Sequence, residues 1–261
     1  MEKIISKNNE RIKAAAKLVS SSANRRERGL FIIEGVRLCR DAFLSGAVFE
    51  EIFVTEAALK KYSEELTFLY EKEAKCFEVS EDAAAKLSGT VSPQGIFCVC
   101  KTLDKKYNID KIGQGGRYIA FDNLQNPDNL GACLRTAEAL GINGVIVGGG
   151  CDIYNPKVQR AAMGAALRLP VFETDDLPGF LRGCALRGLK AYSCTPNENA
   201  VSVTEADFSG GAVCVIGNEG AGISGEVMDA CGGRVTIPMK GRAESLNAAS
   251  AAAIVMWEMV R

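Results

Sequence analysis

The sequence predicts an α/β protein with two domains, and three observations support this prediction. The chain has 261 residues, enough for one large or two small domains. Short apolar runs alternate with segments of helical spacing along most of the chain, which is typical of α/β folds. A polar segment ending in Gly115 and Gly116 separates two such series. We therefore expect a linker at residues 106–116, between a domain at 1–105 and a domain at 117–261.

The first domain is predicted to be small and to mix strands with helices. Its first 20 residues are polar and have helical spacing, and a loop-like basic segment follows them. The expected strands are short apolar runs, and each expected helix carries apolar residues on one side. We expect strands at 30–33, 51–55, 76–79 and 96–100, and helices at 34–46, 57–70 and 81–87.

The second domain is predicted to be a parallel, doubly wound sheet, because its strands alternate regularly with longer helices. We expect strands at 118–121, 144–147, 170–173, 191–194, 213–216 and 235–238, and helices at 130–140, 156–167, 176–186, 224–230 and 246–260. Ligands bind at the carboxyl ends of the strands in such sheets. The chemistry is therefore expected in the loops at 122–129, 148–155, 195–199, 217–222 and 239–245.

Charge excludes one class of function and leaves another open. The chain has 31 Lys or Arg and 32 Asp or Glu, which excludes a wholly basic nucleic-acid binder. Residues 1–40 nevertheless hold ten Lys or Arg and only four Glu. This segment is either an ordinary solvated surface or a face that contacts phosphates, because Arg side chains fit phosphate oxygens. The candidate RNA-binding residues are Arg25, Arg26, Arg28 and Arg37.

The absence of His limits the kinds of catalytic and metal site that the chain can form. Without His, the chain lacks the commonest general base and the imidazole metal ligand. Its ten Cys form no CxxC pair, so we expect no metal site and reduced thiols in a cytoplasmic protein. We also expect no signal peptide and no membrane span, since no apolar run approaches about 20 residues.

Three of the expected loops have unusual composition. The first crowds polar residues before a helix, where Asp128 or Asn129 would cap the helix and Arg135 would lie less than two turns further on. The second, at 217–222, has three Gly in six positions and would place Glu219 at the edge of the sheet. The third places Ser245 and Asn247 at the entry of the final helix, which begins with a run of small residues. Taken singly, each loop is also compatible with an ordinary capped helix.

The three segments together resemble the SpoU/TrmH family of RNA ribose 2′-O-methyltransferases, within the SPOUT superfamily. The motifs that carry the resemblance are Asn126-Pro127-Asp128-Asn129-Leu130-Gly131 with Arg135, then Ile216-Gly217-Asn218-Glu219-Gly220-Ala221-Gly222-Ile223-Ser224, and then Ile237-Pro238-Met239 with Glu244-Ser245-Leu246-Asn247. Residues 1–100, with Phe31-Ile32-Ile33-Glu34-Gly35, are similar to the family's substrate-binding domain, which has the ribosomal protein L30e/L7Ae fold. Asp128 and Ala248-Ala249 depart from the residues frequent in the family.

The resemblance implies a C-terminal trefoil knot that forms a pocket for S-adenosyl-L-methionine (AdoMet), a homodimer, and an RNA substrate. It implies that the catalytic residues are Asn129, Arg135, Glu219, Ser245 and Asn247. It also implies that the cofactor-binding residues are Thr195, Gly217, Asn218, Gly220, Ile237, Met239 and Leu246.

Other functions stay open at this point. The segment Gly220–Gly225 spells GxGxxG, but the short chain after it lacks the further units of a dinucleotide-binding fold. A non-catalytic RNA-binding relative is a second alternative. Within the methyltransferases the substrate is ribosomal or transfer RNA, and a separate N-terminal domain favours ribosomal RNA by resemblance.

Overall fold

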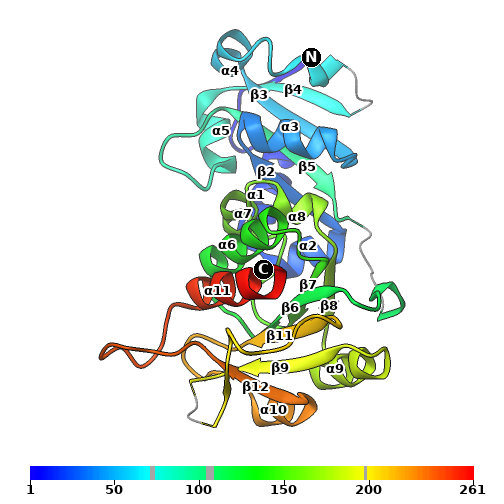
Figure 1. Cartoon of the computed structure of the whole chain (residues 1–261). Coiled ribbons are helices and arrows are strands. Elements are labelled where there is room, and N and C mark those ends of the chain that lie inside the picture. The colour runs from blue at the N-terminus through cyan, green and yellow to red at the C-terminus, as the bar shows by residue number, and fades with distance from the viewer. Residues whose placement is uncertain (71–73, 104–108, 197–198) are drawn as a thin grey trace. The chain divides into compact units, whose positions relative to one another are not determined.

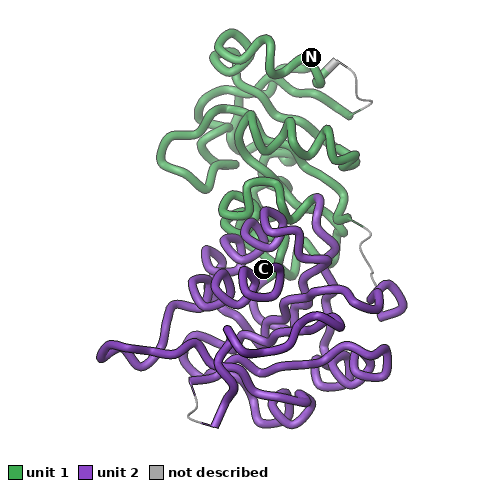
Figure 2. Tube along the Cα trace, viewed as in Figure 1, with its two compact units in different colours: residues 1–104, 152–167 green, residues 105–151, 168–261 purple. Residues whose placement is uncertain are grey.

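A computed structural model describes residues 1–70, 74–103, 109–196 and 199–261, and the chain forms two compact units (Figure 2). Unit 1 contains Met1–Asp104 and Asp152–Leu167, and unit 2 contains Lys105–Cys151 and Arg168–Arg261. Residues 152–167, which the sequence analysis placed in the second domain, thus pack with unit 1. The assignment of separate functional domains stays a prediction.

Unit 1 contains a mixed sheet of five strands in the order β1-β4-β3-β5-β2. Strands β1, β4 and β3 are parallel, whereas β5 runs antiparallel to both β3 and β2. The strands are β1 (Glu2–Ile4), β2 (Leu30–Glu34), β3 (Phe49–Thr55), β4 (Lys75–Val79) and β5 (Ile96–Lys101). The helices are α1 (Glu10–Ser20), α2 (Ser22–Arg28), α3 (Val36–Leu44), α4 (Glu56–Lys61), α5 (Glu81–Leu87) and α7 (Pro156–Ala162), with the 3₁₀ turn η1 (Thr67–Tyr70).

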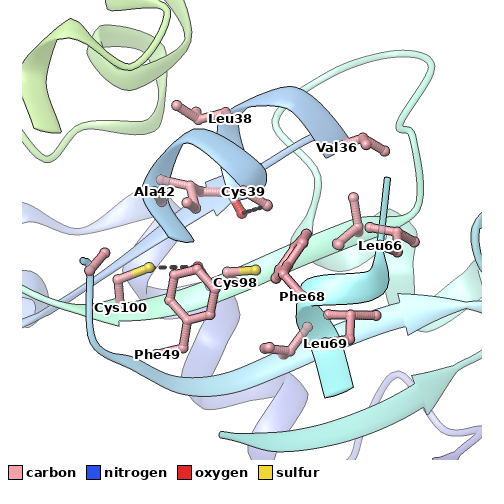
Figure 3. Packing of buried hydrophobic residues seen from close by; sticks show 14 of the residues in the cluster. Val36, Leu38, Cys39, Ala42, Phe49, Leu66, Phe68, Leu69, Cys98 and Cys100 are labelled. Carbon is pink, nitrogen blue, oxygen red and sulfur yellow. Dashed lines mark hydrogen bonds between the residues drawn. The ribbon is translucent and has the colours of Figure 1, made fainter. Parts of the chain in front are cut away.

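Both faces of this sheet are buried, because successive side chains of a strand point to opposite faces. Along β3, Ile52 and Val54 enter one apolar cluster, and Phe53 enters the other. Along β5, Cys98 and Cys100 join the first cluster, which Figure 3 shows packed beneath α3. All ten Cys of the chain are reduced thiols. Burial raises the pKa of Cys98 and Cys100 well above its usual value, so both behave as small apolar core residues.

Unit 2 contains the predicted parallel sheet, with seven strands in the order β10-β12-β9-β11-β6-β7-β8. Every neighbouring pair in it is parallel. The strands are β6 (Arg117–Asp122), β7 (Gly144–Gly148), β8 (Val171–Thr174), β9 (Lys190–Cys194), β10 (Val201–Ser202), β11 (Ala212–Ile216) and β12 (Gly233–Thr236). The helices are α6 (Pro127–Ala139), α9 (Leu177–Leu186), α10 (Gly225–Ala230) and α11 (Ala248–Val260), with η2 (Ile109–Lys111); α8 (Ala165–Arg168) spans the junction at residue 168.

Helices cover this sheet from two sides (Figure 1). Helices α9 and α10 pack over one apolar cluster that includes Leu181 and Val227, together with Val213 and Val215 of β11. Helix α11 packs against α6 and over β6 and β11. The central strands are therefore buried on both faces, as the near-continuous apolar run of β11 requires.

Several elements differ from the predicted ones. The first 20 residues form β1 as well as α1, and the basic segment forms helix α2. That helix is stabilised at its ends, because the Ser21 side chain accepts a hydrogen bond from Asn24 N–H and Gly29 adopts a left-handed conformation. The expected helix at 57–70 contains only α4 and the turn η1. The expected helix at 156–167 breaks where Met163 and Gly164 both take positive φ angles.

The structure also bears on membrane insertion. Within the described ranges, no helix has both the length and the apolar character needed to cross a membrane.

Candidate functional site

Four loops of unit 2 meet at one edge of the sheet. Strands β12, β9, β11 and β6 are neighbours and all run parallel, so their carboxyl ends lie side by side. Each of these strands leads into a polar loop that the sequence analysis singled out. The polar motifs, which lie up to about 120 residues apart in sequence, are gathered here by the topology of the sheet rather than by local structure.

The loops after β9, β11 and β12 surround a cavity of about 430 Å³, and the loop after β6 contributes no residue to its wall. A cavity of this size suits a small molecule, since ligand pockets span roughly 300–1,000 Å³. It is lined by most of the predicted site residues, namely Thr195, Gly217, Asn218, Glu219, Gly220, Ile237, Met239, Ser245, Leu246 and Asn247. Asn129 and Arg135 do not line it.

A chain of side-chain hydrogen bonds joins the three motifs beside the cavity. Asn129 Nδ2 donates to Glu219 Oε1 at 2.9 Å, and Asn247 Nδ2 donates to Asn129 Oδ1 at 3.0 Å. Asn129 is buried, with 7% of its surface exposed, so both ends of its amide need these partners. Asn247 also caps α11, because its Oδ1 accepts from Ala249 N–H and Ser250 N–H. The orientation of Asn129 is therefore fixed by one residue from each of the other two motifs.

Glu219 holds the first loop as well as Asn129. Its carboxylate accepts from Gln125 N–H at 3.1 Å and from Asn126 N–H at 3.0 Å. Desolvation alone would raise the pKa of Glu219, but the hydrogen bonds from Asn129 and from these backbone groups outweigh it and lower the pKa. Burial, assisted by the negative charge of Glu219, raises the pKa of Cys133 to about 12. Glu219 is therefore a carboxylate and Cys133 a neutral thiol at neutral pH.

The glycine-rich loop is shaped by Asn218 and by a close backbone approach. Asn218 Oδ1 accepts from Gly220 N–H and Ala221 N–H, each at 2.9 Å, and Asn218 Nδ2 donates to the Asn123 carbonyl at 2.9 Å. A Cβ atom on Gly217 would lie 2.3 Å from the carbonyl carbon of Gly222. Gly217 is therefore needed where the loop folds back on itself.

One polar atom in the cavity wall is left for a ligand. The hydroxyl oxygen of Thr195 is buried and has no hydrogen-bond partner in the described part of the chain. Buried hydroxyl groups almost always have a partner, so an orphan in a cavity wall indicates a bound polar group. Among the described residues, the wall also contains the carboxylates of Glu219 and Glu244 and no Lys or Arg, a charge pattern that suits a cationic ligand.

Arg135 lies apart from the cavity. It is exposed on α6, six residues after Asn129. Ser245 and Asn247 are also exposed, at the entry of α11. The structure thus brings nearly all of the predicted catalytic and cofactor-binding residues to one place, while Arg135 lies at the surface of α6.

Sequence reasoning missed part of the cavity wall. Ala251 and Val255 of α11 line the cavity four and eight residues after Asn247. This spacing places them on the same face of the helix as its cap and was visible in the sequence. Cys194 and Glu244 also line the cavity, next to predicted residues on either side of the site.

The predicted RNA-binding arginines do not form one group. Arg25 is buried, its Nε and Nη2 atoms both lie 2.7 Å from Asp152 Oδ2, and its Nη1 donates to the Leu18 carbonyl. The prediction that Arg25 contacts RNA is therefore wrong for this structure, since its donors are already used inside unit 1. Arg26, Arg28 and Arg37 are exposed, and Arg28 also donates to the Ala14 carbonyl.

Comparison with known proteins agrees with this geometry. Residues 116–257 match the SpoU rRNA Methylase family, and residues 9–98 match the MRM3-like substrate binding domain. The chain is 31% identical over 260 residues to the 23S rRNA (guanosine(2553)-2′-O)-methyltransferase RlmP of Bacillus subtilis, covering 99% of both chains.

Two solved structures share the whole fold. One is an RNA 2′-O ribose methyltransferase, with a TM-score of 0.83, 30% identity, and coverage of 98% of this chain and 97% of the other. The second is the SpoU methyltransferase AviRb of Streptomyces viridochromogenes in complex with AdoMet, with a TM-score of 0.86, 26% identity and 97% coverage of both chains. The family match spans more than half of the chain and contains the whole cavity. The protein therefore belongs to the SpoU rRNA methylase family.

Proposed function

We propose that the protein transfers a methyl group from AdoMet to a ribose 2′-hydroxyl of ribosomal RNA. The observation that carries this proposal is the hydrogen-bond chain Glu219–Asn129–Asn247 beside the cavity, because it joins the three family motifs into one rigid unit. The comparisons support the RNA class, since RlmP of Bacillus subtilis is named as a 23S rRNA methyltransferase.

The cavity fits the cofactor. AdoMet, when bound, supplies an electrophilic methyl group on a positively charged sulfur. The Thr195 hydroxyl offers it a buried, unpartnered hydrogen-bonding group, and the loop around Gly217 offers backbone groups at the sheet edge. Met239 and Leu246 provide apolar wall, and Glu219 and Glu244 supply negative charge that favours a cation.

The residues around the transfer act mainly by holding the hydroxyl in place. Each Asn amide has two N–H donors, and Asn129 and Asn247 each use one of them within the chain of hydrogen bonds. We assign the second donors, together with the Ser245 hydroxyl, to fixing the attacking 2′-oxygen. Alignment of this kind can supply much of the rate enhancement when the leaving group is good.

Glu219 is a positioning residue in this scheme rather than the base. It already accepts three hydrogen bonds, and its lowered pKa makes it a weak proton acceptor at neutral pH. The sequence contains no His, so we assign the proton of the 2′-hydroxyl to solvent water. We assign Arg135, which is exposed on the helix that carries Asn129, to binding an adjacent RNA phosphate.

We further propose that the protein works as a homodimer with a trefoil knot in its C-terminal domain, in the cytoplasm and without a metal. Support for the dimer comes from α11, where Ile254 and Trp257 are 38% and 55% exposed and lie three residues apart on one face. A second copy of the chain would cover this apolar surface.

The test combines cofactor binding with methyl transfer. Calorimetric titration of the purified protein with AdoMet is expected to saturate near one site per chain. With in-vitro transcribed, unmodified 23S rRNA, the wild type is expected to incorporate the labelled methyl group. Asn129→Ala is expected to keep AdoMet binding within a few-fold and to lower methyl transfer about 100-fold, because removal of one preorganised donor typically has an effect of this size.

Asn8→Ala serves as the matched control, since Asn8 is an exposed asparagine in unit 1. It is expected to behave like the wild type in both assays. Failure of the wild type to bind AdoMet would refute the methyltransferase assignment. Full activity of Asn129→Ala would refute the role given to the hydrogen-bond chain.

A further inference from the structure

We infer that the side-chain amide of Gln125 recognises the base of the methylated nucleotide and selects a base with an exocyclic amine over uracil. This inference rests on the proposed function, because it concerns the nucleotide whose ribose would be held beside Asn129. It assigns base specificity to the loop between β6 and α6, outside the cavity wall.

Glu219 holds Gln125 next to the proposed ribose site. The two oxygens of this one carboxylate bind both residues, since Oε2 accepts from Gln125 N–H at 3.1 Å and Oε1 accepts from Asn129 Nδ2 at 2.9 Å. Glu219 lines the cavity, whereas Gln125 and Asn129 do not. The base of a nucleotide is only one sugar ring away from its 2′-oxygen. A nucleotide whose 2′-oxygen reaches Asn129 therefore has its base within reach of Gln125.

The amide group of Gln125 is fixed, although the residue is exposed. Its Nε2 donates to Asn123 Oδ1 at 2.7 Å and, over a longer distance of 3.4 Å, to the Asn123 carbonyl oxygen. Since a carbonyl oxygen can only accept, the second contact also identifies which end of the amide is the nitrogen. Holding an exposed glutamine in one rotamer costs conformational entropy and buries no apolar surface. The fixed amide therefore calls for a reason beyond packing.

The amide oxygen of Gln125 is left as an acceptor for a ligand. Both contacts to Asn123 use the nitrogen, and Oε1 has no hydrogen-bond partner within the part of the chain that the structure describes. Adenine, cytosine and guanine each carry an exocyclic amine that donates N–H groups, whereas uracil has carbonyl oxygens in place of an amine. An outward acceptor of fixed direction therefore favours the three amine-bearing bases.

Asn123 is a rigid anchor that does not need the glutamine. Its φ angle is +57°, in the left-handed region that residues other than glycine rarely adopt. Its N–H donates to the Gly148 carbonyl at 2.9 Å, and its carbonyl accepts from Asn218 Nδ2 at 2.9 Å. The backbone of Gly150 lies so close that a Cβ there would be 2.3 Å from the Leu124 carbonyl oxygen. Support of the backbone is therefore already provided by other residues.

The charge of this loop favours a base over a phosphate group. Residues 122–129 include the carboxylates of Asp122 and Asp128 and contain no Lys or Arg, and Glu219 adds a third carboxylate. Negative charge at this position repels a phosphate, whereas neutral amides form hydrogen bonds with base edges. Single-stranded RNA presents such edges, because its bases can be splayed out of the stack.

The experiment compares four RNA substrates that differ in one base. In-vitro transcribed 23S rRNA is treated with the wild-type protein and AdoMet, and mapping of ribose methylation identifies the modified nucleotide. Four transcripts then carry adenine, cytosine, guanine or uracil at that position, and kcat/KM for methyl transfer is measured with each. The wild type is expected to modify the uracil transcript at least about tenfold less efficiently than the best of the other three, as loss of a base contact predicts.

Two variants test the amide and its anchor. Gln125→Ala is expected to lower kcat/KM about tenfold on the best transcript and to leave the uracil transcript within about twofold, so that the preference disappears. Asn123→Gly removes only the side-chain anchor, because glycine adopts a φ of +57° without strain. It is expected to reduce the preference several-fold, since the glutamine amide is then free to rotate.

Gln114→Ala is the matched control. Gln114 is also an exposed glutamine in a loop next to β6, but it precedes the strand, whereas Gln125 follows it. The control is expected to keep the wild-type preference. Calorimetric titration with AdoMet is expected to give the wild-type affinity for all three variants, because none of the three residues lines the cavity, and this result shows that each variant is folded.

The outcomes separate this inference from the proposed function. If Gln125→Ala leaves the preference unchanged, or lowers kcat/KM by the same factor on all four transcripts, the inference is refuted. A mapped nucleotide that is a uridine, or equal use of all four bases by the wild type, also refutes it. In each of these cases methyl transfer by the wild type leaves the proposed function standing. If the wild type binds AdoMet but methylates no transcript, the proposed function fails and the inference fails with it.

Discussion

Glu34 in unit 1 and Glu219 in unit 2 use the same interaction for different purposes. Each carboxylate accepts three hydrogen bonds from one short segment more than 50 residues away in sequence. Glu34 accepts from the loop residues Ser88, Gly89 and Thr90, and Glu219 accepts from Gln125, Asn126 and Asn129. In unit 2 one of the three donors is Asn129, which passes the constraint on to Asn247 beside the cavity. In unit 1 the donors all belong to the loop itself, and the constraint ends at an exposed tip.

The sheets explain this difference. All neighbouring strands of unit 2 are parallel, so several loops meet at one edge and their side chains can form a network around a cavity. In unit 1, β5 runs antiparallel to its neighbours, so the loops are divided between both ends of the sheet. A segment held by a carboxylate therefore joins a network of side chains beside the cavity in unit 2, whereas the segment at 88–90 in unit 1 joins no such network.

The largest effect is expected from breaking the buried ion pair of unit 1. Arg25→Ala removes the guanidinium that pairs with Asp152, whose side chain is 10% exposed, and should destabilise unit 1 by about 3–5 kcal/mol. Urea denaturation of the full chain, followed by far-ultraviolet circular dichroism, measures this loss. The cavity lies wholly in unit 2, so AdoMet titration below the transition should give the wild-type affinity. Arg26→Ala, at the neighbouring exposed position, is the control, and an equal loss in both variants would contradict the prediction.

The next largest effect is expected from adding a side chain to the glycine-rich loop beside the cavity of unit 2. Gly217→Ala forces a Cβ to within 2.3 Å of the backbone of Gly222, which should cost about 1–3 kcal/mol and lower AdoMet affinity at least tenfold. Gly220→Ala in the same loop should be tolerated, because the nearest atom would be Asn218 Oδ1 at 3.7 Å. Calorimetry compares the two variants. Equal affinities would show that the loop can open without affecting the cofactor.

A third experiment replaces each of the two carboxylates in turn by a neutral amide. Charge-assisted hydrogen bonds are roughly twice as strong as neutral ones, so Glu→Gln at either position should weaken its loop by about 1 kcal/mol, or about fivefold. Glu219→Gln should lower the rate of methyl transfer and leave RNA affinity unchanged. Glu34→Gln should lower the stability of unit 1 and leave AdoMet affinity unchanged. Identical profiles for the two variants would break the comparison between the units.

The smallest expected effect is the change in the free energy of unfolding as the pH falls. The folded-state pKa of Glu219 is lowered from its usual 4.5, so its contribution to stability is present above that value and is lost as pH falls through the folded pKa. Because Glu219 is exposed, we expect less than about 1 kcal/mol. The stability difference between wild type and Glu219→Gln, measured by urea denaturation, should shrink between pH 5 and pH 3. A difference that grows with acidity would contradict the assigned direction.

Much of the fold was predictable because its signals are local. The strands at 118–121 and 213–216 and the final helix lie within one or two residues of β6, β11 and α11, since strong apolar runs and caps such as Asn247 specify them. The break at Met163 and Gly164 was not predictable from periodicity, because the apolar pattern continues through it. The basic residues were also a poor guide to function, since Arg25 looks like its exposed neighbours in sequence but is buried in the structure, where it pairs with Asp152 and donates to the Leu18 carbonyl.

The sequence by itself determined which chemistry is available: no His, three polar motifs in order, and a parallel sheet whose loops can meet. Only the tertiary structure decided which residues use that chemistry. Asn129, Glu219 and Asn247 become one hydrogen-bonded unit because the sheet order places β6 beside β11 and packs α11 against α6. Hydrogen bonds form only over about 3 Å. Sequence periodicity cannot predict that Asn129 bonds to Glu219, 90 positions away, and to Asn247, 118 positions away.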